Sequence, residues 1–251
     1  MLSSTGTGAK SSTADGGRRF RPGATLTVLV LVALAVLLSL GTWQVRRLAW
    51  KTALIETITS RGAEPAIPVE QALDDPAAND FRHVGAAGRY RHDLAFAMGT
   101  VAERGEVGGR LVTPLLLPDG RAVLVERGWL PERLLPPGTP EAIQPSGQVE
   151  LDGVARFHGG DRAGVFTPDN RPEQRRWYWY DLAGLRAALG LEVEPLVLAL
   201  GRSDTGGALP QPLPVRADLP NNHLGYAITW YGLAIALVAV YVAFGLKRGG
   251  A

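Results

Sequence analysis

Two long apolar segments stand near the two ends of the chain. Residues Ala24–Leu40 are apolar except for two threonines and one serine, and the run extends through Gly41, Thr42 and Trp43. The second segment, Leu224–Leu246, carries no formal charge. About 20 consecutive apolar residues are enough for a helix to cross the hydrocarbon core of a bilayer. The pattern therefore predicts two transmembrane helices, at 24–43 and at 221–246.

The first apolar segment also has some features of a signal peptide. A basic stretch with Arg18, Arg19 and Arg21 precedes it, and this order of basic and apolar regions is typical of both kinds of segment. The residues Leu40–Gln44 offer no small-x-small cleavage site, and the run is nearly a full span, so an uncleaved anchor is favoured. Helical spacing predicts that this helix continues to about Ser60, through Trp43, Arg47, Trp50, Leu54 and Ile58.

The placement of positive charge predicts how the chain crosses the membrane. Basic residues favour the cytoplasmic side, and two spans place both termini on the same side. We therefore expect a disordered cytoplasmic tail at 1–23 and a second cytoplasmic tail at 247–251. Residues 1–17 have almost no large apolar side chain and cannot bury enough surface to fold. The domain at 44–220 then faces outward, in the periplasm, and the protein is a multi-pass protein of the cytoplasmic membrane. The basic residues of the tails are Arg18, Arg19, Arg21, Lys247 and Arg248.

Between the two segments, short runs with turn residues between them are typical of β-strands. Asp119-Gly120 lies between two of these runs and indicates a hairpin turn. Helical patterns occur at Val69–Leu73 and at Leu182–Leu189, and Gly190 is a common helix terminator. We expect a membrane α+β fold, in which two transmembrane helices flank one outward-facing, strand-rich α+β domain. The predicted strands are His83–Tyr90, Leu94–Val101, Arg110–Leu117, Ala122–Trp129, Val149–Phe157, Trp177–Asp181 and Leu196–Leu200.

The stretch Arg127-Gly128-Trp129-Leu130-Pro131 is the most distinctive part of this domain. Its glycine indicates a bulge or a close backbone approach, and its proline ends the strand. We expect Trp129 to be a core residue and Arg127 to be either a surface residue or one half of an ion pair.

Composition excludes several classes of site. The chain has no cysteine, which excludes disulfides, thiol nucleophiles and cysteine-ligated metals. The 26 basic and 24 acidic residues nearly balance, and no basic run interleaved with aromatic residues suggests nucleic-acid binding. No phosphate loop, nucleophile elbow or zinc-protease motif is present. Nothing in the sequence places Asp80, His83 and Ser203 together as a triad, so we expect a protein that is not an enzyme.

His223 is the candidate ligand in the second apolar segment. Pro220 and Asn221 mark the start of the predicted helix, and asparagine is a favoured N-cap, so His223 is expected in the first helical turn. A neutral imidazole can ligate a metal ion. The alternative is a polar residue that only bonds to its neighbours or to lipid headgroups.

Several stretches together resemble the surfeit locus protein 1 family of cytochrome c oxidase assembly factors. The resemblance runs through much of the chain in the same order, with Glu126 standing where the family commonly has asparagine. The matching residues are Leu40-Gly41-Thr42-Trp43-Gln44 with Arg47, Trp50 and Lys51; Gly88-Arg89-Tyr90; Thr113-Pro114-Leu115; Asp119-Gly120; Val123 to Pro131; Asn221-Asn222-His223-Leu224; and Tyr226-Ala227-Ile228-Thr229-Trp230.

This resemblance implies a membrane protein that helps to build the haem-containing catalytic subunit of an oxidase. Bacterial members are similar to haem a-binding proteins, and the histidine that His223 matches is their proposed iron ligand. Haem a would be held transiently, with Arg46 or Arg47 meeting its propionates. The implied partners are the catalytic subunit, haem a or its synthesis machinery, and the lipid bilayer. A cofactor-free scaffold for an oxidase assembly intermediate is the alternative, and a membrane-anchored enzyme or solute-binding domain is a second one.

Helix geometry predicts which face of the second span packs on the first span and which face binds haem or the oxidase subunit. At 100° per residue, Tyr226 and Trp230 lie within about 60° of His223, while Gly225, Gly232 and Ala236 collect nearly opposite. Small residues let membrane helices approach closely. We therefore expect the small face to pack on the first span, leaving His223, Tyr226 and Trp230 turned outward to haem or the oxidase subunit.

Overall fold

The computed structural model of the chain describes residues 23–160, 162, 164–215, 217–218 and 220–248. The predicted disordered tail lies outside the described residues except for Gly23, and so do residues 249–251 of the second tail. The chain divides at Thr52 and again at Pro220 into two compact units. One unit contains the apolar helices and the other contains the strands. The domain boundary predicted at residue 44 falls inside the first helix, and the two units divide at Thr52 instead.

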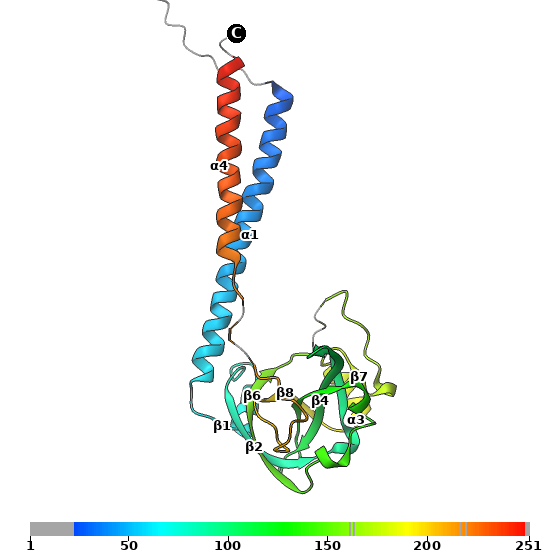
Figure 1. Cartoon of the computed structure of the whole chain (residues 1–251). Coiled ribbons are helices and arrows are strands. Elements are labelled where there is room, and N and C mark those ends of the chain that lie inside the picture. Colours follow the sequence, from blue (N-terminus) through cyan, green and yellow to red (C-terminus); the bar gives the residue numbers. More distant parts are fainter. Residues whose placement is uncertain (1–22, 161, 163, 216, 219, 249–251) are drawn as a thin grey trace, which may run out of the picture. The chain divides into compact units, whose positions relative to one another are not determined.

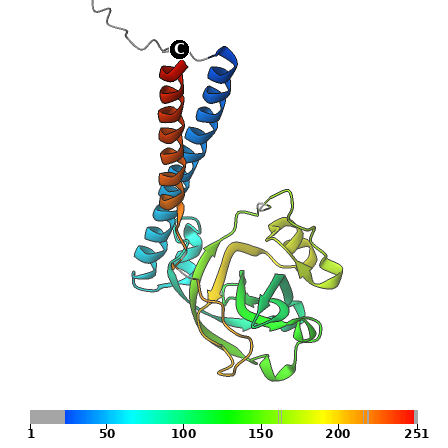
Figure 2. The ribbon, with the colours of Figure 1, turned by 45° about the horizontal axis from the view of Figure 1, so that its top comes forward.

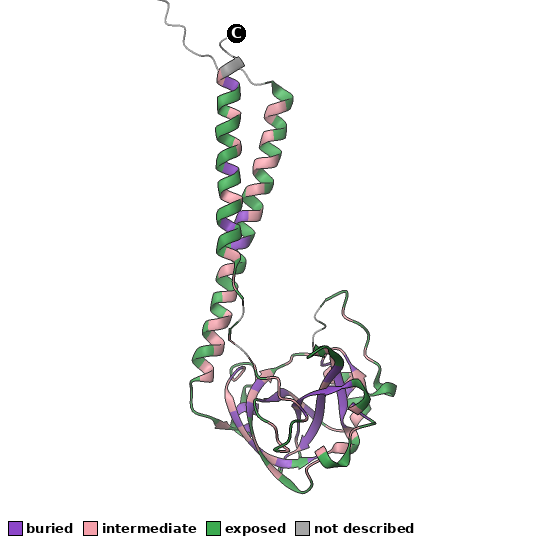
Figure 3. Ribbon diagram, viewed as in Figure 1, coloured by how far each residue is buried: buried purple, intermediate pink, exposed green. Residues whose placement is uncertain are grey.

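The helical unit contains most of α1 (Ala24–Gly62) and all of α4 (His223–Arg248), which lie side by side (Figures 1 and 2). The prediction that the first helix continues past its apolar run is confirmed, since it ends at Gly62. Both helices are long and apolar enough to cross a membrane, and most of their residues are exposed (Figure 3). The second helix begins at His223, so Asn222 precedes it rather than the predicted cap Asn221.

The strand unit is built around a closed barrel. Strands β2, β6, β8, β5 and β4 pair in this order, and β2 also pairs with β4 at Arg89–Tyr90, which closes the ring (Figure 2). The sheet extends beyond the barrel through β3 and β7 on one side and β1 on the other. The strands are β1 (Ile67–Pro68), β2 (His83–Tyr90), β3 (Phe96–Glu103), β4 (Glu106–Leu116), β5 (Ala122–Pro131), β6 (Gln148–Phe157), β7 (Arg176–Trp177) and β8 (Val193–Leu200).

Short helices connect these strands. The predicted helices are confirmed as α2 (Val69–Asp74) and α3 (Leu182–Leu189). Asp181 caps α3 by accepting from the Gly184 N–H, and Gly190 ends it in the left-handed region. The remaining short 3-10 segments are η1 (His92–Leu94), η2 (Glu132–Leu134), η3 (Glu141–Ile143) and η4 (Pro172–Gln174).

The sequence placed most strands correctly but overextended one. A strand was expected at Trp177–Asp181, and β7 in fact ends at Trp177. The backbone turns there because the side chain of Asn170 accepts from the N–H groups of Tyr178 and Trp179, which replaces strand pairing.

The predicted hairpin is confirmed. Strands β4 and β5 pair antiparallel from Gly108↔Pro131 to Leu116↔Ala122, and Gly120 takes a φ of 90° in the turn. Trp129 is buried, and its indole N–H donates to the Val101 carbonyl at 3.0 Å. The expected bulge is also present as a register shift between Leu111 and Val112.

The backbone conformation and close surroundings of Gly128 explain why residue 128 must be a glycine. Its φ is 133°, and a Cβ at this position would lie 2.3 Å from the Gln211 carbonyl oxygen. Trp129 bonds to Gln211 in both directions, with its N–H donating at 2.6 Å and its carbonyl accepting at 2.9 Å. The segment after β8 is therefore hydrogen-bonded directly to the end of β5, at a place where only glycine fits.

Three apolar clusters form the core, visible as buried ribbon in Figure 3. The first takes side chains from all five barrel strands and fills the barrel, with Val84, Leu115, Val125, Ala155 and Leu198 among its members. The second gathers Phe96, Met98, Leu124, Trp177 and Leu185 beneath α3. The third holds Leu111, Leu130 and Leu135.

A charged pair lies within this apolar interior. The Arg127 side chain has no exposed area and that of Asp204 is 3% exposed. Arg127 donates through Nε to Asp204 Oδ2 at 2.6 Å and through Nη2 to Oδ1 at 3.2 Å, and Nη2 also donates to the Ile143 carbonyl at 2.7 Å. The prediction of an ion-paired Arg127 is thus confirmed.

Two ring side chains complete this buried cluster. Tyr90 donates its hydroxyl to Asp204 Oδ2 at 2.8 Å, and the Arg127 guanidinium lies 4.9 Å from the centre of its ring. Burial and the negative charge of Asp204 raise the pKa of Tyr90, so its phenol stays protonated and donates. Burial lowers the pKa of His92, whose Nε2 lies 2.9 Å from the Pro145 carbonyl.

Removing the counter-charge of Arg127 should strongly destabilise the strand unit. Asp204→Asn keeps the side-chain shape but leaves a buried guanidinium without its partner, which costs about 3–5 kcal/mol. The measurement is denaturant unfolding of the full-length protein in micelles. Asp93→Asn, in the exposed pair with Arg91, is the matched control and should cost about 0–1 kcal/mol. Equal losses in the two variants would contradict this account.

Candidate functional site

The site is built on the face that α4 presents to α1. Ala227 and Ala234 are buried on this face, and the ring of Tyr231 lies against Gly41, where a Cβ would be 2.9 Å from ring carbons. The Tyr231 hydroxyl hydrogen-bonds with Thr42 Oγ1 at 3.1 Å. Further along the pair, the Tyr241 hydroxyl bonds Thr27 Oγ1 at 2.7 Å.

The prediction that the Gly225, Gly232 and Ala236 face packs on the first span is wrong. All three residues are exposed, and a Cβ added to either glycine would meet no atom within 4 Å. The close approach uses a small residue of α1, Gly41, rather than the small residues of α4. The tyrosines face α1 because their hydroxyls find partners there, which an apolar surrounding would not provide.

His223 lies on the same inward side. Its Nδ1 is 2.8 Å from Gln44 Oε1, and Gln44 is one of the few buried polar residues described, with 8% exposure. The His223 side chain is partly buried, and the described residues provide no hydrogen-bond partner for its Nε2. The structure therefore joins His223 to a residue that the sequence reasoning left without a role.

The backbone just before His223 is fastened to α1. The Lys51 ammonium donates to the Pro220 carbonyl, and the Asn221 amide donates to Thr52 Oγ1 at 3.4 Å. The Tyr226 N–H reaches back to the Asn222 carbonyl at 3.4 Å and closes the first turn. These contacts hold the start of α4 at a fixed height along α1.

The other predicted site residues are spread around the helices. Tyr226 is exposed, while Trp230 is partly buried. Arg46 and Arg47 are exposed, and the Arg47 guanidinium stacks 4.0 Å from the ring centre of Trp50. Arg47 follows Gln44 by about 300° around the helix and Arg46 by about 200°, so Arg47 is nearer to the side of His223.

Comparison with known proteins identifies the family. The profile of the SURF1 family matches residues 31–235, which includes α1 from Leu31, the whole strand unit and the first half of α4. This chain belongs to the SURF1 family. It is 34% identical to the SURF1-like protein of Monosiga brevicollis, over 86% of this chain and 85% of that protein. It is 31% and 30% identical to Surfeit locus protein 1 of Xenopus tropicalis and Homo sapiens, over 83% of this chain and 72% and 73% of those proteins.

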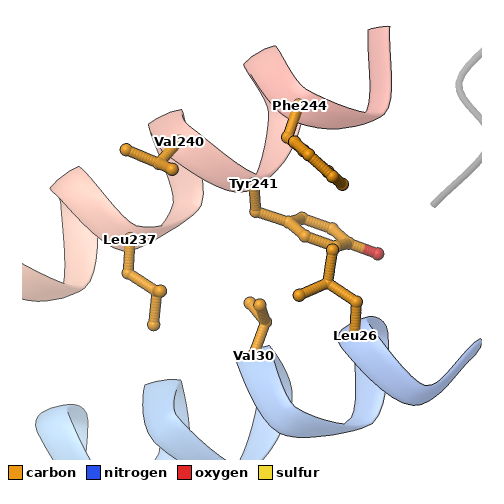
Figure 4. Close-up of a pocket in the computed structure, with 6 residues that line it drawn as sticks. All are labelled: Leu26, Val30, Leu237, Val240, Tyr241 and Phe244. Carbon is orange, nitrogen blue, oxygen red and sulfur yellow. The ribbon is translucent and has the colours of Figure 1, made fainter. Parts of the chain in front are cut away.

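Apolar grooves line the helix pair of this SURF1 family member on both sides of the contact face. One groove of about 460 Å³ includes Leu34, Leu38, Tyr231 and Ile235, and the other, of about 570 Å³, includes Val36 and Leu233. A smaller pocket of about 240 Å³ lies where α1 begins (Figure 4). The Tyr241 ring lies there beside Leu26 and Phe244. These surfaces suit lipid tails or other apolar partners.

Glu126 has structural contacts in this SURF1 family protein. Its carboxylate lies 3.2 Å from Arg110 Nε and accepts the Tyr180 hydroxyl at 3.2 Å. Burial raises the pKa of Glu126, and burial together with the nearby Glu126 carboxylate raises the pKa of Tyr180. The His158 ring packs on Tyr180 with 4.3 Å between ring centres. Glu126 thus serves as a bridge between a strand and the segment that covers it.

The residues considered as a triad do not come together. Asp80 pairs with Arg156 and accepts the Phe157 N–H, while Ser203 bonds to Thr205. His83 Nδ1 lies 3.6 Å from an Asp152 oxygen. In the described part of the chain, no group of three histidine, cysteine or acidic side chains could hold a metal ion.

His158 should make the strand unit sensitive to acid. Burial, aided by Arg156 and Arg110, lowers the pKa of its imidazole to about 4. The unfolded chain takes up this proton near pH 6.5, so the free energy of unfolding should fall as the pH drops from about 6.5 to 4. Unfolding measured at pH 7.5 and 4.5 should show a smaller acid loss for His158→Phe than for the wild type. An unchanged difference between the two pH values would refute this role.

Proposed function

We propose that this protein is a non-catalytic assembly factor for a haem-copper cytochrome c oxidase, which holds haem a transiently and passes it to the catalytic subunit. Membership of the SURF1 family supports the assembly role, through the resemblance set out above. The observation that carries the haem step is the state of His223. Its Nδ1 is occupied by Gln44, while its Nε2 is left without a protein partner by the described residues.

The donor set fits a haem cargo better than a bare metal ion. A single imidazole cannot hold an ion by itself, and no multi-residue cluster lies in the described part of the chain. A haem brings four nitrogen ligands and needs only an axial one from the protein. The apolar surfaces of α1 and α4 suit a macrocycle at bilayer depth.

The remaining candidate residues have supporting roles in this proposal. Tyr226 lies one turn and Trp230, which is partly buried, two turns after His223 on the same side of α4, so both can contact a macrocycle bound there. Arg47 is better placed than Arg46 to meet a propionate, because it lies closer to the Gln44 side of α1. Its guanidinium stacks on Trp50, and a guanidinium stacked on an aromatic ring can still donate its N–H groups to an anion.

We place the protein in the cytoplasmic membrane with both termini inside and the strand unit outside. The basic residues of the two tails support this orientation, since long translocated domains tolerate the basic residues at the start of the domain. A reporter enzyme that is active only in the cytoplasm, fused after Ala251, should be active. A matched fusion in the loop just before β6, after Ser146, should be inactive, and the reverse result would overturn the topology.

Haem retention should depend on His223. His223→Ala removes the axial ligand, while lipid still enforces both helices, so insertion and the strand unit should persist. Protein purified from cells that make haem a should show the haem absorption bands for the wild type and lose them for the variant. His83→Ala, on a strand of the other unit, is the control and should retain haem. Full haem occupancy in His223→Ala would contradict the proposal, and a wild type without haem would favour the scaffold.

A further inference from the structure

Gln44 is an unusual residue to find on the inward face of an apolar helix. An amide removed from water costs free energy unless it is hydrogen-bonded, so a buried glutamine at the end of an apolar span needs a reason. Gln44 is 8% exposed, and the hydrogen bond that it makes through its side chain goes to His223 on the other helix. The two residues lie 179 positions apart in the chain.

The atoms in contact decide the protonation of the imidazole. A carboxamide oxygen only accepts hydrogen bonds, so the partner nitrogen of a neutral imidazole must carry the proton. Gln44 Oε1 faces Nδ1 at 2.8 Å, and therefore Nδ1–H is the donor. A neutral imidazole has one N–H, so the lone pair available for ligation is on Nε2.

The orientation of the ring follows from the same contact. Gly41 lets Tyr231 pack tightly one turn of α1 before Gln44, and Lys51 and Thr52 hold the residues just before His223. The Gln44 backbone is therefore fixed relative to the first turn of α4. The hydrogen bond then limits rotation of the His223 ring and keeps Nε2 on the side of the ring away from Gln44.

We propose that Gln44 is the positioning residue for the axial ligand: by accepting from Nδ1–H, it selects the tautomer of His223 that offers Nε2 to the haem iron and aims it. This inference rests on the proposed function. Outer hydrogen bonds of this kind orient ligating histidines and increase their basicity, and their loss commonly weakens metal binding by about 10- to 100-fold.

The alternative is that the bond only holds the two helices together. The chain offers a matched control for this, because Thr42 and Tyr231 form a second hydrogen bond across the same helix contact without touching His223. If pairing alone mattered, Thr42→Val and Gln44→Leu would have similar effects on every property of the bound haem.

The first test needs no haem. Full-length protein labelled with ¹⁵N-histidine in micelles should show His223 protonated at Nδ1, with His223→Ala identifying its signals. Gln44→Leu should shift protonation towards Nε2, whereas Gln44→Glu, whose carboxylate also accepts, and Thr42→Val should keep the wild-type tautomer. Protonation at Nε2 in the wild type, or no change in Gln44→Leu, would overturn the inference.

The second test measures the bound haem. Gln44→Leu should retain haem a about 10- to 100-fold more weakly than wild type. Thr42→Val should retain it as the wild type does. Gln44→Glu should still bind, and the reduction potential of its haem should fall because a carboxylate makes the imidazole a stronger electron donor. A change in helix pairing would not produce this shift in reduction potential. The Gln44→Glu measurement therefore still tests the inference if Gln44→Leu fails to accumulate.

The outcomes separate the two proposals. A wild type that retains no haem a overturns the proposed function and with it the positioning role of Gln44, whatever the tautomer of His223. A wild type that retains haem a through His223, together with Gln44 variants that match Thr42→Val in affinity and potential, overturns only the present inference.

Discussion

A buried positive charge constrains the strand unit. The Arg127 guanidinium has no exposed area, so the fold must bring acceptors to it. The acceptors come from two separate parts of the chain, Asp204 from the segment after β8 and the Ile143 carbonyl from η3. Tyr90, at the end of β2, donates its hydroxyl to the same Asp204 carboxylate. The barrel is closed by the β2–β4 pairing and filled by apolar side chains, but the positions of these connecting segments depend on the Arg127 guanidinium.

The helix pair follows a different rule. Apolar side chains gain little by facing another apolar helix rather than lipid, so polar contacts and close packing decide which faces meet. In α1 and α4 the contacts are made by two tyrosine hydroxyls and one histidine, which bond to Thr27, Thr42 and Gln44. The chemistry that orients the helices is thus the same chemistry that sets the state of His223.

The sequence predicted local features better than distant ones. The β4–β5 hairpin and the ends of α3 could be predicted because turn and cap residues act over a few positions. Closure through the β2–β4 pairing and the partnership of Arg127 with Asp204 depend on segments far apart in the chain, for which one sequence carries no signal. The facing side of α4 was predicted wrongly because small residues were weighted above tyrosine hydroxyls. Gln44 carried a usable signal, since it is a polar residue directly after the first apolar run.

The scarcity of sulfur in this chain bears on its chemical durability. The chain has no cysteine, and the only sulfur among the described residues is the Met98 thioether, which is 3% exposed beneath α3. Thiols and exposed thioethers are the side chains that oxidants attack first. The haem step proposed above would place the protein next to an iron porphyrin, which is a source of such oxidants. The fold needs no disulfide to form, and its described part has no accessible sulfur. Oxidants that inactivate proteins by attacking thiols or exposed thioethers therefore find no such group in the described part of this chain.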